Sequence, residues 1–135
     1  DPAYRTGATA MLLWSGAAKL ARERGATHVI GCASISMNDR GAHAAAVYSK
    51  LARRYLAPSE YRVRPRSPLA ALANPVTPPW STPALIKGGL RLGAWVSGEP
   101  AWDPDFNTAD LLLFLPVTRI ETRCAQPVAQ DRQAA

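Results

Sequence analysis

The chain has 135 residues, of which 47% are hydrophobic, and it carries a formal net charge of +6. This size and composition fit one soluble globular domain and exclude a larger multidomain architecture. No apolar run approaches the roughly 18 residues that span a bilayer, and no leader peptide is recognisable, so we expect a cytoplasmic protein.

The basic excess predicts an acidic partner, whether nucleic acid, an anionic membrane surface or an acidic protein. Five arginines lie close together against a single acid, Glu60; they stand at positions 53, 54, 62, 64 and 66. Nucleic-acid modules interleave such charges with stacking aromatics in recognisable motifs, which this stretch lacks. We therefore expect Arg62 and Arg64 to bind a protein partner, with a solvated surface as the alternative.

The residues that commonly hold metals or act as nucleophiles are scattered. Cys32 lies in an apolar run and Cys124 in a polar stretch, so neither a disulfide nor a metal site is expected. His43 stands near a predicted helix start without a patterned Ser or Cys nucleophile, so it receives no role.

The N-terminal segment Tyr4–Thr9 runs directly into an apolar-periodic stretch from Ala10 to Arg24. A turn that opens a helix leaves N–H groups unpaired, and these favour a bound phosphate together with the helix dipole. Arg5 adds positive charge, and Gly7 lets a ligand approach the backbone. The segment Arg5-Thr6-Gly7-Ala8-Thr9 is therefore a candidate pyrophosphate cradle, with an ordinary helix start as the alternative.

Periodicity predicts the first half of the fold. A helix over 10–24 places Leu13, Trp14 and Leu20 on its apolar stripe, and Gly25 ends it. A strand over 28–35 is apolar on both faces, which predicts a buried, parallel strand in mid-sheet. A second helix over 41–56 follows, with Asn38 and Asp39 as candidate caps. Residues 61–64 alternate like a strand, and the proline-rich stretch 65–83 predicts a long surface loop.

The second half contains a predicted helix and two strands. Ser81-Thr82-Pro83 is a helix-start signature, and Gly93 is a plausible stop. Strands are predicted over 94–97 and 109–115, joined by a loop over 98–107. Together these elements indicate an α/β (α+β) fold with a mixed sheet flanked by helices. Residues 1–116 would form the domain and 117–135 a polar, disordered tail.

Two of these motifs resemble the GNAT acyltransferase superfamily. Arg5-Thr6-Gly7-Ala8 resembles its cofactor-binding turn, and Ala44-x-x-Val47-Tyr48-x-Lys50-Leu51 is similar to the helix whose tyrosine faces the acyl thioester. The resemblance implies a phosphopantetheine thioester donor, on acyl carrier protein or coenzyme A, and no permanently bound cofactor. It implies that Tyr48 protonates the departing thiolate. Because that turn normally lies in mid-domain, the chain resembles the C-terminal half of a GNAT-like domain.

A third stretch resembles one group of enzymes within this superfamily. Leu85–Ala94 and the loop Gly98-Glu99-Pro100-Ala101-Trp102-Asp103-Pro104-Asp105-Phe106 closely resemble bacterial ornithine N-acyltransferases, the hemolysin-like enzymes of ornithine-lipid synthesis. This implies transfer of a 3-hydroxyacyl group from acyl carrier protein to the α-amine of ornithine. Glu99, Asp103 and Asp105 place three carboxylates on one loop, which could hold the ammonium groups of an amino acid. A rigid turn with solvated acids is the alternative.

Other functions share much of this pattern. Acyl-homoserine-lactone synthases and N-acyl amino acid synthases have the same expected fold and differ in the acceptor. A noncatalytic module that docks an acidic protein or the inner-membrane surface through its arginines belongs to another class.

Overall fold

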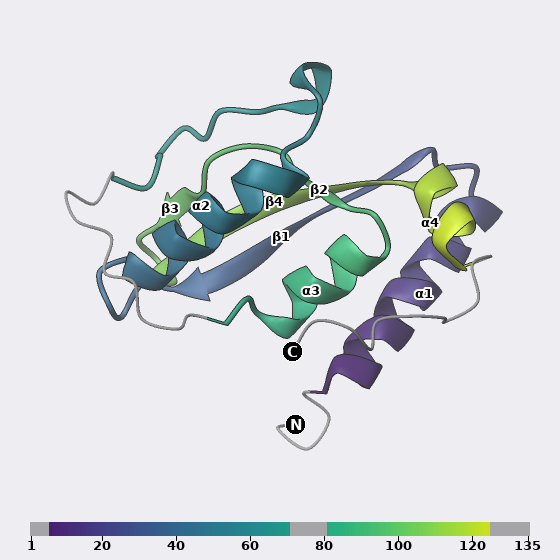
Figure 1. Cartoon of the computed structure of the whole chain (residues 1–135), viewed down its shortest axis with the longest axis horizontal. Coiled ribbons are helices and arrows are strands. Elements are labelled where there is room, and N and C mark those ends of the chain that lie inside the picture. Colours follow the sequence, from purple (N-terminus) through teal and green to yellow (C-terminus); the bar gives the residue numbers. More distant parts are fainter. Residues whose placement is uncertain (1–5, 71–80, 125–135) are drawn as a thin grey trace.

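The computed structural model describes residues 6–70 and 81–124 (Figure 1). In chain order they form α1 (Gly7–Glu23), β1 (His28–Ser36), α2 (Ala42–Tyr55), the 3₁₀ helix η2 (Ser59–Tyr61), α3 (Ala84–Arg91), β2 (Trp95–Val96), β3 (Ala101–Asp103), β4 (Thr108–Pro116) and α4 (Val117–Cys124). This mixed arrangement of helices and sheet confirms the predicted α+β class.

The sheet is organised around β4. β1 pairs with β4 along its whole length, from His28 opposite Pro116 to Ser36 opposite Thr108, in antiparallel register. β2 and β3 pair with two different parts of β4, also antiparallel, so the described strands form an antiparallel sheet and not the predicted mixed one. Because each edge of a strand pairs with one neighbour at a given position, β2 and β3 share the edge of β4 opposite β1.

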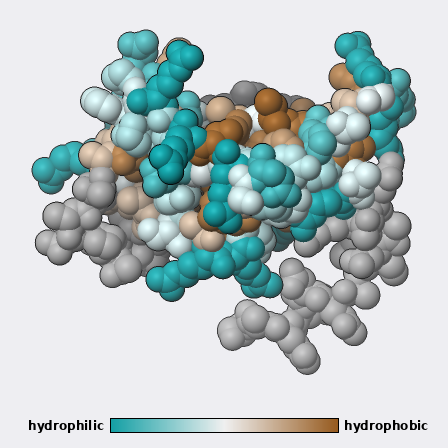
Figure 2. Space-filling model, turned by 90° about the horizontal axis from the view of Figure 1, so that it is seen from above, coloured by the Kyte–Doolittle hydropathy of each residue, from teal (hydrophilic) through white to brown (hydrophobic). Residues whose placement is uncertain are grey.

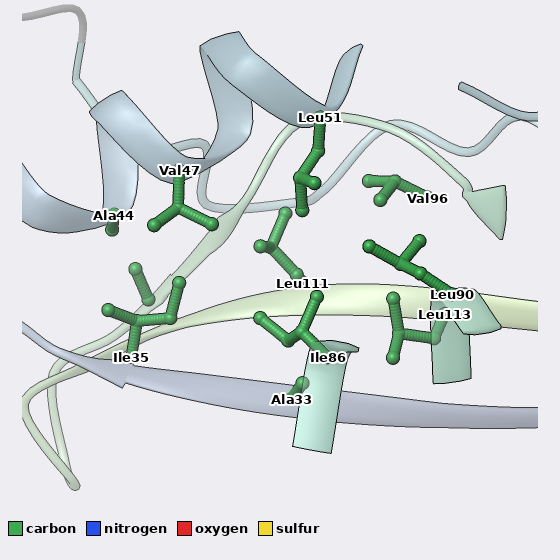
Figure 3. Packing of buried hydrophobic residues seen from close by; sticks show 11 residues of the cluster. Ala33, Ile35, Ala44, Val47, Leu51, Ile86, Leu90, Val96, Leu111 and Leu113 are labelled. Atoms are coloured by element: carbon green, nitrogen blue, oxygen red, sulfur yellow. The ribbon is translucent and has the colours of Figure 1, made fainter. Parts of the chain in front are cut away.

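One face of the sheet carries the core. Side chains in β4 alternate, so that Ala109, Leu111, Leu113 and Leu115 are buried while those between them are half-buried. Figure 3 shows how residues of three elements converge on this face: Val47 and Leu51 of α2, Ile86 and Leu90 of α3, and Ile35 of β1. This apolar cluster fixes α2 and α3 against the strands.

The packing of α1 on α3 explains why α3 contains a glycine at position 89. The ring of Trp14 lies against Gly89, where an added Cβ would stand 3.1 Å from the ring. The indole N–H of Trp14 donates to the carbonyl of Leu85 over 3.3 Å. Gly89 therefore weakens α3 as an isolated helix but allows the close approach of α1.

The face of α1 that packs matches the predicted stripe only in part: Trp14 packs against both core clusters, as predicted, but the two leucines of the stripe do not. Ala18 is buried, with only 4% of its surface exposed, whereas Leu13 and Leu20 are 67% and 49% exposed. Ala18 belongs to a second core cluster with Leu92 and Leu115. A small side chain at the contact lets the helix lie close to its neighbours, so burial follows Ala18 rather than the larger leucines.

The prediction for residues 28–35 is wrong in orientation and burial. β1 is antiparallel, lies at one edge of the described sheet, and exposes Ile30 and Cys32 on the face away from the helices. Side chains of α1, α2 and α3 pack on the opposite face, where Ala33 and Ile35 are buried. A short apolar run does not reveal whether one face or both are covered.

Residues 61–64 do not form the predicted strand. Tyr61 ends η2, and its ring stacks on Phe114 with the ring centroids 4.7 Å apart, on the face of the sheet opposite the core. The segment is joined to the 97–99 stretch by one backbone hydrogen bond, from Val63 to Ser97.

The segment 98–107, predicted as a loop, contains a short strand. β3 lies inside this loop and turns back along β4 as a hairpin. The N-cap of α2 is Gly41, not Asn38 or Asp39. The Asp39 carboxylate still accepts from the N–H groups of Gly41 over 3.0 Å and of His43 over 2.7 Å, so it supports the first turn of α2 from outside the helix. Pro83 is itself the N-cap of α3, and no side-chain cap bond is made there, contrary to the predicted hydroxyl cap.

The predicted tail is corrected over its first part. Residues 117–124 form α4, in which Val117 and Ile120 are buried, so the folded part extends beyond residue 116. The rest of the predicted tail, 125–135, lies outside the described residues, as does part of the proline-rich loop, 71–80. Of the helices in the described ranges, none is long and apolar enough to cross a membrane.

Candidate functional site

A cleft of about 440 Å³ opens on one flank of α2, and we call it the Tyr48 cleft. It is formed by α2 and its end, by the segment that follows η2, and by the start of the 98–107 loop. Its lining residues are Tyr48, Leu56, Arg62, Val63, Arg64, Pro65, Pro68, Gly98 and Glu99. The structure thus brings together the predicted catalytic tyrosine, the two predicted partner-binding arginines and one predicted substrate-binding acid.

Tyr48 projects from a helix that the core holds rigidly. Its neighbours Ala44, Val47 and Leu51 are buried against the sheet, while Tyr48 itself is half-buried at the edge of that contact. Burial raises the pKa of the phenol above its usual value, the negative charge of Glu99 raises it further, and Arg62 opposes the shift. The hydroxyl therefore keeps its proton at neutral pH.

A backbone contact forms the wall of the cleft opposite α2. The N–H of Val63 donates to the carbonyl of Ser97 over 2.7 Å, which ties the segment after η2 to the strand end. A Cβ added at Gly98 would overlap the carbonyl oxygen of Val63. Glycine at position 98 is therefore needed for the two segments to lie this close.

The two arginines of the cleft are held differently. Arg62 donates from Nε to the carbonyl of Ala57 over 2.7 Å, which fixes its guanidinium beside the end of α2. Arg64 lies further along the extended segment and is exposed. Together with Glu99 they give the cleft charges of both signs.

The three predicted substrate-binding acids do not lie together. Glu99 lines the Tyr48 cleft, whereas the carboxylate of Asp103 accepts from the N–H groups of Asp105 and Phe106 over 3.0 and 3.2 Å. This pattern belongs to an Asx turn that closes the β3–β4 hairpin. Asp105 is exposed at the tip of that hairpin, so Glu99 alone is placed to meet a ligand in the cleft.

The predicted pyrophosphate cradle lies elsewhere. Arg5 lies outside the described residues, and α1 begins at Gly7, with Thr6 as its N-cap. The hydroxyl of Thr6 accepts from the N–H of Thr9 over 3.1 Å, so the helix start supplies its own partner for one of its N–H groups. In Figure 1 this end of α1 lies apart from α2, so the described structure does not bring Thr6–Thr9 into the Tyr48 cleft.

Sequence patterns did not indicate a second cleft, on the other flank of α2. It has a volume of about 520 Å³, and we call it the Lys50 cleft. Its lining residues are Lys50, Leu51, Arg54, Tyr55, Thr82, Lys87, Leu90 and Arg91. The sequence signals this cleft only by the spacing of four between Lys50 and Arg54 and between Lys87 and Arg91. By itself, that spacing indicates a solvated helix face.

Figure 2 shows the molecule from above, where hydrophilic side chains surround smaller exposed hydrophobic areas. The described residues contain no group of three His, Cys, Asp or Glu side chains placed to hold a metal ion.

The chain is similar to curated bacterial acyltransferases. It is 34% identical to the L-ornithine N(alpha)-acyltransferase of Brucella abortus over 131 residues, which cover 90% of this chain and 46% of that relative. The L-ornithine N(alpha)-acyltransferases of Agrobacterium fabrum and Rhizobium meliloti are 37% and 35% identical, each over 90% of this chain and 44% of the relative. The chain therefore spans less than half the length of these relatives.

No protein-family model matches the chain, and no solved structure gives a significant match. The resemblance to ornithine N-acyltransferases that the sequence motifs predicted is confirmed by the three relatives.

Proposed function

We propose that the natural protein carrying this chain transfers a 3-hydroxyacyl group from acyl carrier protein to the α-amine of ornithine. The observation that carries this proposal is the similarity, over 90% of the chain, to three relatives named L-ornithine N(alpha)-acyltransferase. The coexistence of a protonated phenol and charges of both signs in the Tyr48 cleft supports it.

In this proposal the Tyr48 cleft holds the amino-acid acceptor. The carboxylate of Glu99 pairs with an ammonium group, and the guanidinium of Arg64 pairs with the α-carboxylate. Ornithine carries two ammonium groups and one carboxylate, so it needs recognition by both signs of charge. Asp103 is already bonded within its turn, and Asp105 lies at the hairpin tip, so neither is part of this acceptor site.

Tyr48 acts as the general acid. The neutral amine attacks the thioester carbonyl, the new C–N bond forms, and the C–S bond breaks with release of a thiolate. The thiolate takes the proton of Tyr48, and the phenolate recovers a proton from the nitrogen that becomes the amide. A thiol, with a pKa of about 8.5, is more acidic than this phenol, so the first transfer depends on the second.

The donor and its carrier protein contact other parts of the chain in this proposal. We propose that the Arg5–Thr9 segment receives the phosphate end of the phosphopantetheine arm, and that Arg62 and Arg64 also face the acidic carrier protein. The fold that we propose is the C-terminal part of a GNAT-like domain. An acyl product would partition into lipid, so we place the protein in the cytoplasm beside the inner membrane.

A product assay tests this function. The natural protein is incubated with 3-hydroxyacyl carrier protein and a panel of amines, namely ornithine, lysine, tyrosine and S-adenosylmethionine, and products are identified by mass. Acylation of ornithine as the dominant product supports the proposal. Dominant acylation of another amine favours an N-acyl amino acid or acyl-homoserine-lactone synthase, and carrier binding without any acylation favours a docking module; either result overturns the named function.

Two variants test the donor contacts. Gly7→Asp introduces bulk and negative charge where the donor phosphate is proposed, so donor affinity measured by calorimetry should fall steeply. Reversing Arg62 and Arg64 to glutamate should slow carrier association, with a smaller effect at high salt. Unchanged donor affinity in the first variant, or unchanged carrier association at low salt in the second, would contradict these assignments.

A further inference from the structure

Two pairs of basic side chains line the Lys50 cleft from opposite helices. Lys50 and Arg54 stand one turn apart on α2, and Lys87 and Arg91 stand one turn apart on α3. A second hollow of about 420 Å³ continues the cleft toward the start of α3 and shares Thr82, Lys87 and Arg91 with it. Four cationic groups thus meet in one continuous depression.

Lys50, Arg54 and Lys87 share the cleft with no acidic side chain among its described lining residues. Among the described residues that line either hollow there is no Asp or Glu. Lys50 and Arg54 stand four residues apart on α2 and repel each other, and Lys87 of α3 brings a further positive charge to the same cleft. A bound anion would offset this repulsion.

Apolar residues at the floor of the cleft favour a single bound anion over diffuse counterions. Leu51 and Leu90 are buried at its base, and the half-buried ring of Tyr55 forms one side, with the guanidinium carbon of Arg54 lying 5.8 Å from its centroid. Thr82 is 8% exposed and adds a hydroxyl beside Lys87. An apolar base lowers the local dielectric, so charges at the rim attract an anion more strongly than on an open surface.

We propose that the Lys50 cleft is a binding site for a phosphate-bearing ligand, held chiefly by Lys50, Arg54 and Lys87. A phosphate or pyrophosphate group offers several acceptor oxygens to several donors at once, which suits cations arriving from two helices. This site is distinct from the Tyr48 cleft and does not depend on the acyl-transfer proposal.

Calorimetry with inorganic pyrophosphate tests the site in the 135-residue chain. The double variant Lys50→Glu with Lys87→Glu reverses one charge on each helix. The matched control is Arg53→Glu with Arg66→Glu, which makes the same change in net charge at exposed positions outside both hollows. Thermal melting verifies that both variants fold.

We expect pyrophosphate to bind the wild type and the control, and to bind the cleft variant at least about tenfold more weakly, since charged hydrogen bonds are lost. Lys50→Arg with Lys87→Arg should keep most of the affinity, because arginine also binds phosphate. Absence of pyrophosphate binding to the wild type, or equal weakening in the cleft variant and the control, would overturn the proposal.

Competition identifies the source of the phosphate. Displacement of pyrophosphate by 4′-phosphopantetheine assigns the cleft to a soluble phosphoester, and displacement by phosphatidylglycerol vesicles, but not phosphatidylcholine vesicles, assigns it to a lipid headgroup. Both results support the site. Pyrophosphate binding in a protein that acylates no amine would leave this inference standing while the proposed function fails.

Discussion

The two flanks of α2 carry clefts of similar size and different charge. The Tyr48 cleft, of about 440 Å³, combines Glu99 with Arg62 and Arg64. The Lys50 cleft, of about 520 Å³, has only basic groups among the ionised side chains of its described lining residues. A zwitterionic amino acid needs charges of both signs around it, while a phosphate group needs only positive charge. The charge content of each cleft therefore indicates a different class of ligand.

One helix, α2, contributes side chains to both clefts. Ala44, Val47 and Leu51 anchor α2 to the sheet, with 0–3% of their surfaces exposed. The side chains on either flank of that anchored stripe then project into separate clefts from a rigid backbone. Substitutions in the cleft on one flank of α2 should therefore leave ligand binding in the cleft on the other flank unaffected.

The largest difference between the flanks should appear in catalysis. Replacing Tyr48 by phenylalanine removes the proton donor and keeps the ring, so kcat for ornithine acylation by the natural protein should fall about 10²- to 10⁴-fold. Tyr55→Phe, which removes a hydroxyl from the Lys50 cleft on the same helix, is the matched control and should keep its rate. Equal losses in the two variants would mean that the flanks are not functionally separate.

The wall of the Tyr48 cleft should be the next most sensitive feature. An alanine at position 98 would overlap the carbonyl of Val63, so Gly98→Ala should lower the free energy of unfolding by about 1–3 kcal/mol. Gly31→Ala is the control, because an added Cβ there meets nothing within 4 Å. Denaturant unfolding of both variants measures the difference, and a fully stable Gly98→Ala would contradict the described contact.

Acceptor binding should respond more modestly to the loss of Glu99. Glu99→Gln removes the negative charge from the Tyr48 cleft, and because this side chain is exposed, KM for ornithine should rise only about two- to tenfold. Asp105→Asn makes the same change at the hairpin tip and should leave KM unaltered. A larger effect from Asp105→Asn would place the acceptor on the hairpin instead.

The smallest expected effect is the pH dependence of stability. Burial and Glu99 hold the pKa of Tyr48 above the value of about 10 that it has in an unfolded chain. The unfolded chain therefore loses this proton first, so the contribution is intact below about pH 10 and is lost as the pH rises through the raised pKa. Unfolding free energies measured on both sides of that range should fall more for the wild type than for Tyr48→Phe.

Much of the local structure could be predicted from the sequence. The periodicity that predicted helices over 41–56 and after Pro83 reflects the one-sided burial of α2 and α3, and the apolar run at 109–115 does form β4. The orientation of the strands, and which face of the sheet the helices cover, could not be predicted in the same way. The long β1–β4 pairing joins residues about eighty positions apart, and the helices that cover one face are specified only by tertiary packing.

The site was predictable residue by residue but not as an arrangement. Tyr48 and Glu99 were each singled out by a motif, yet their presence in one cleft depends on the contact between Val63 and Ser97, which no local pattern encodes. Asp103 has the same chemistry as Glu99, but its carboxylate serves a turn. The basic pairs on α2 and α3 are visible as spacings of four, while their convergence follows from the packing of both helices on the same core.

The most direct test of the account is a structure of the natural protein with ornithine bound, determined by crystallography. We predict that ornithine occupies the Tyr48 cleft, with an ammonium group beside the Glu99 carboxylate and the α-amine on the side of the Tyr48 hydroxyl. Ornithine bound in the Lys50 cleft, or at the hairpin that carries Asp103 and Asp105, would contradict the assignment of the two flanks.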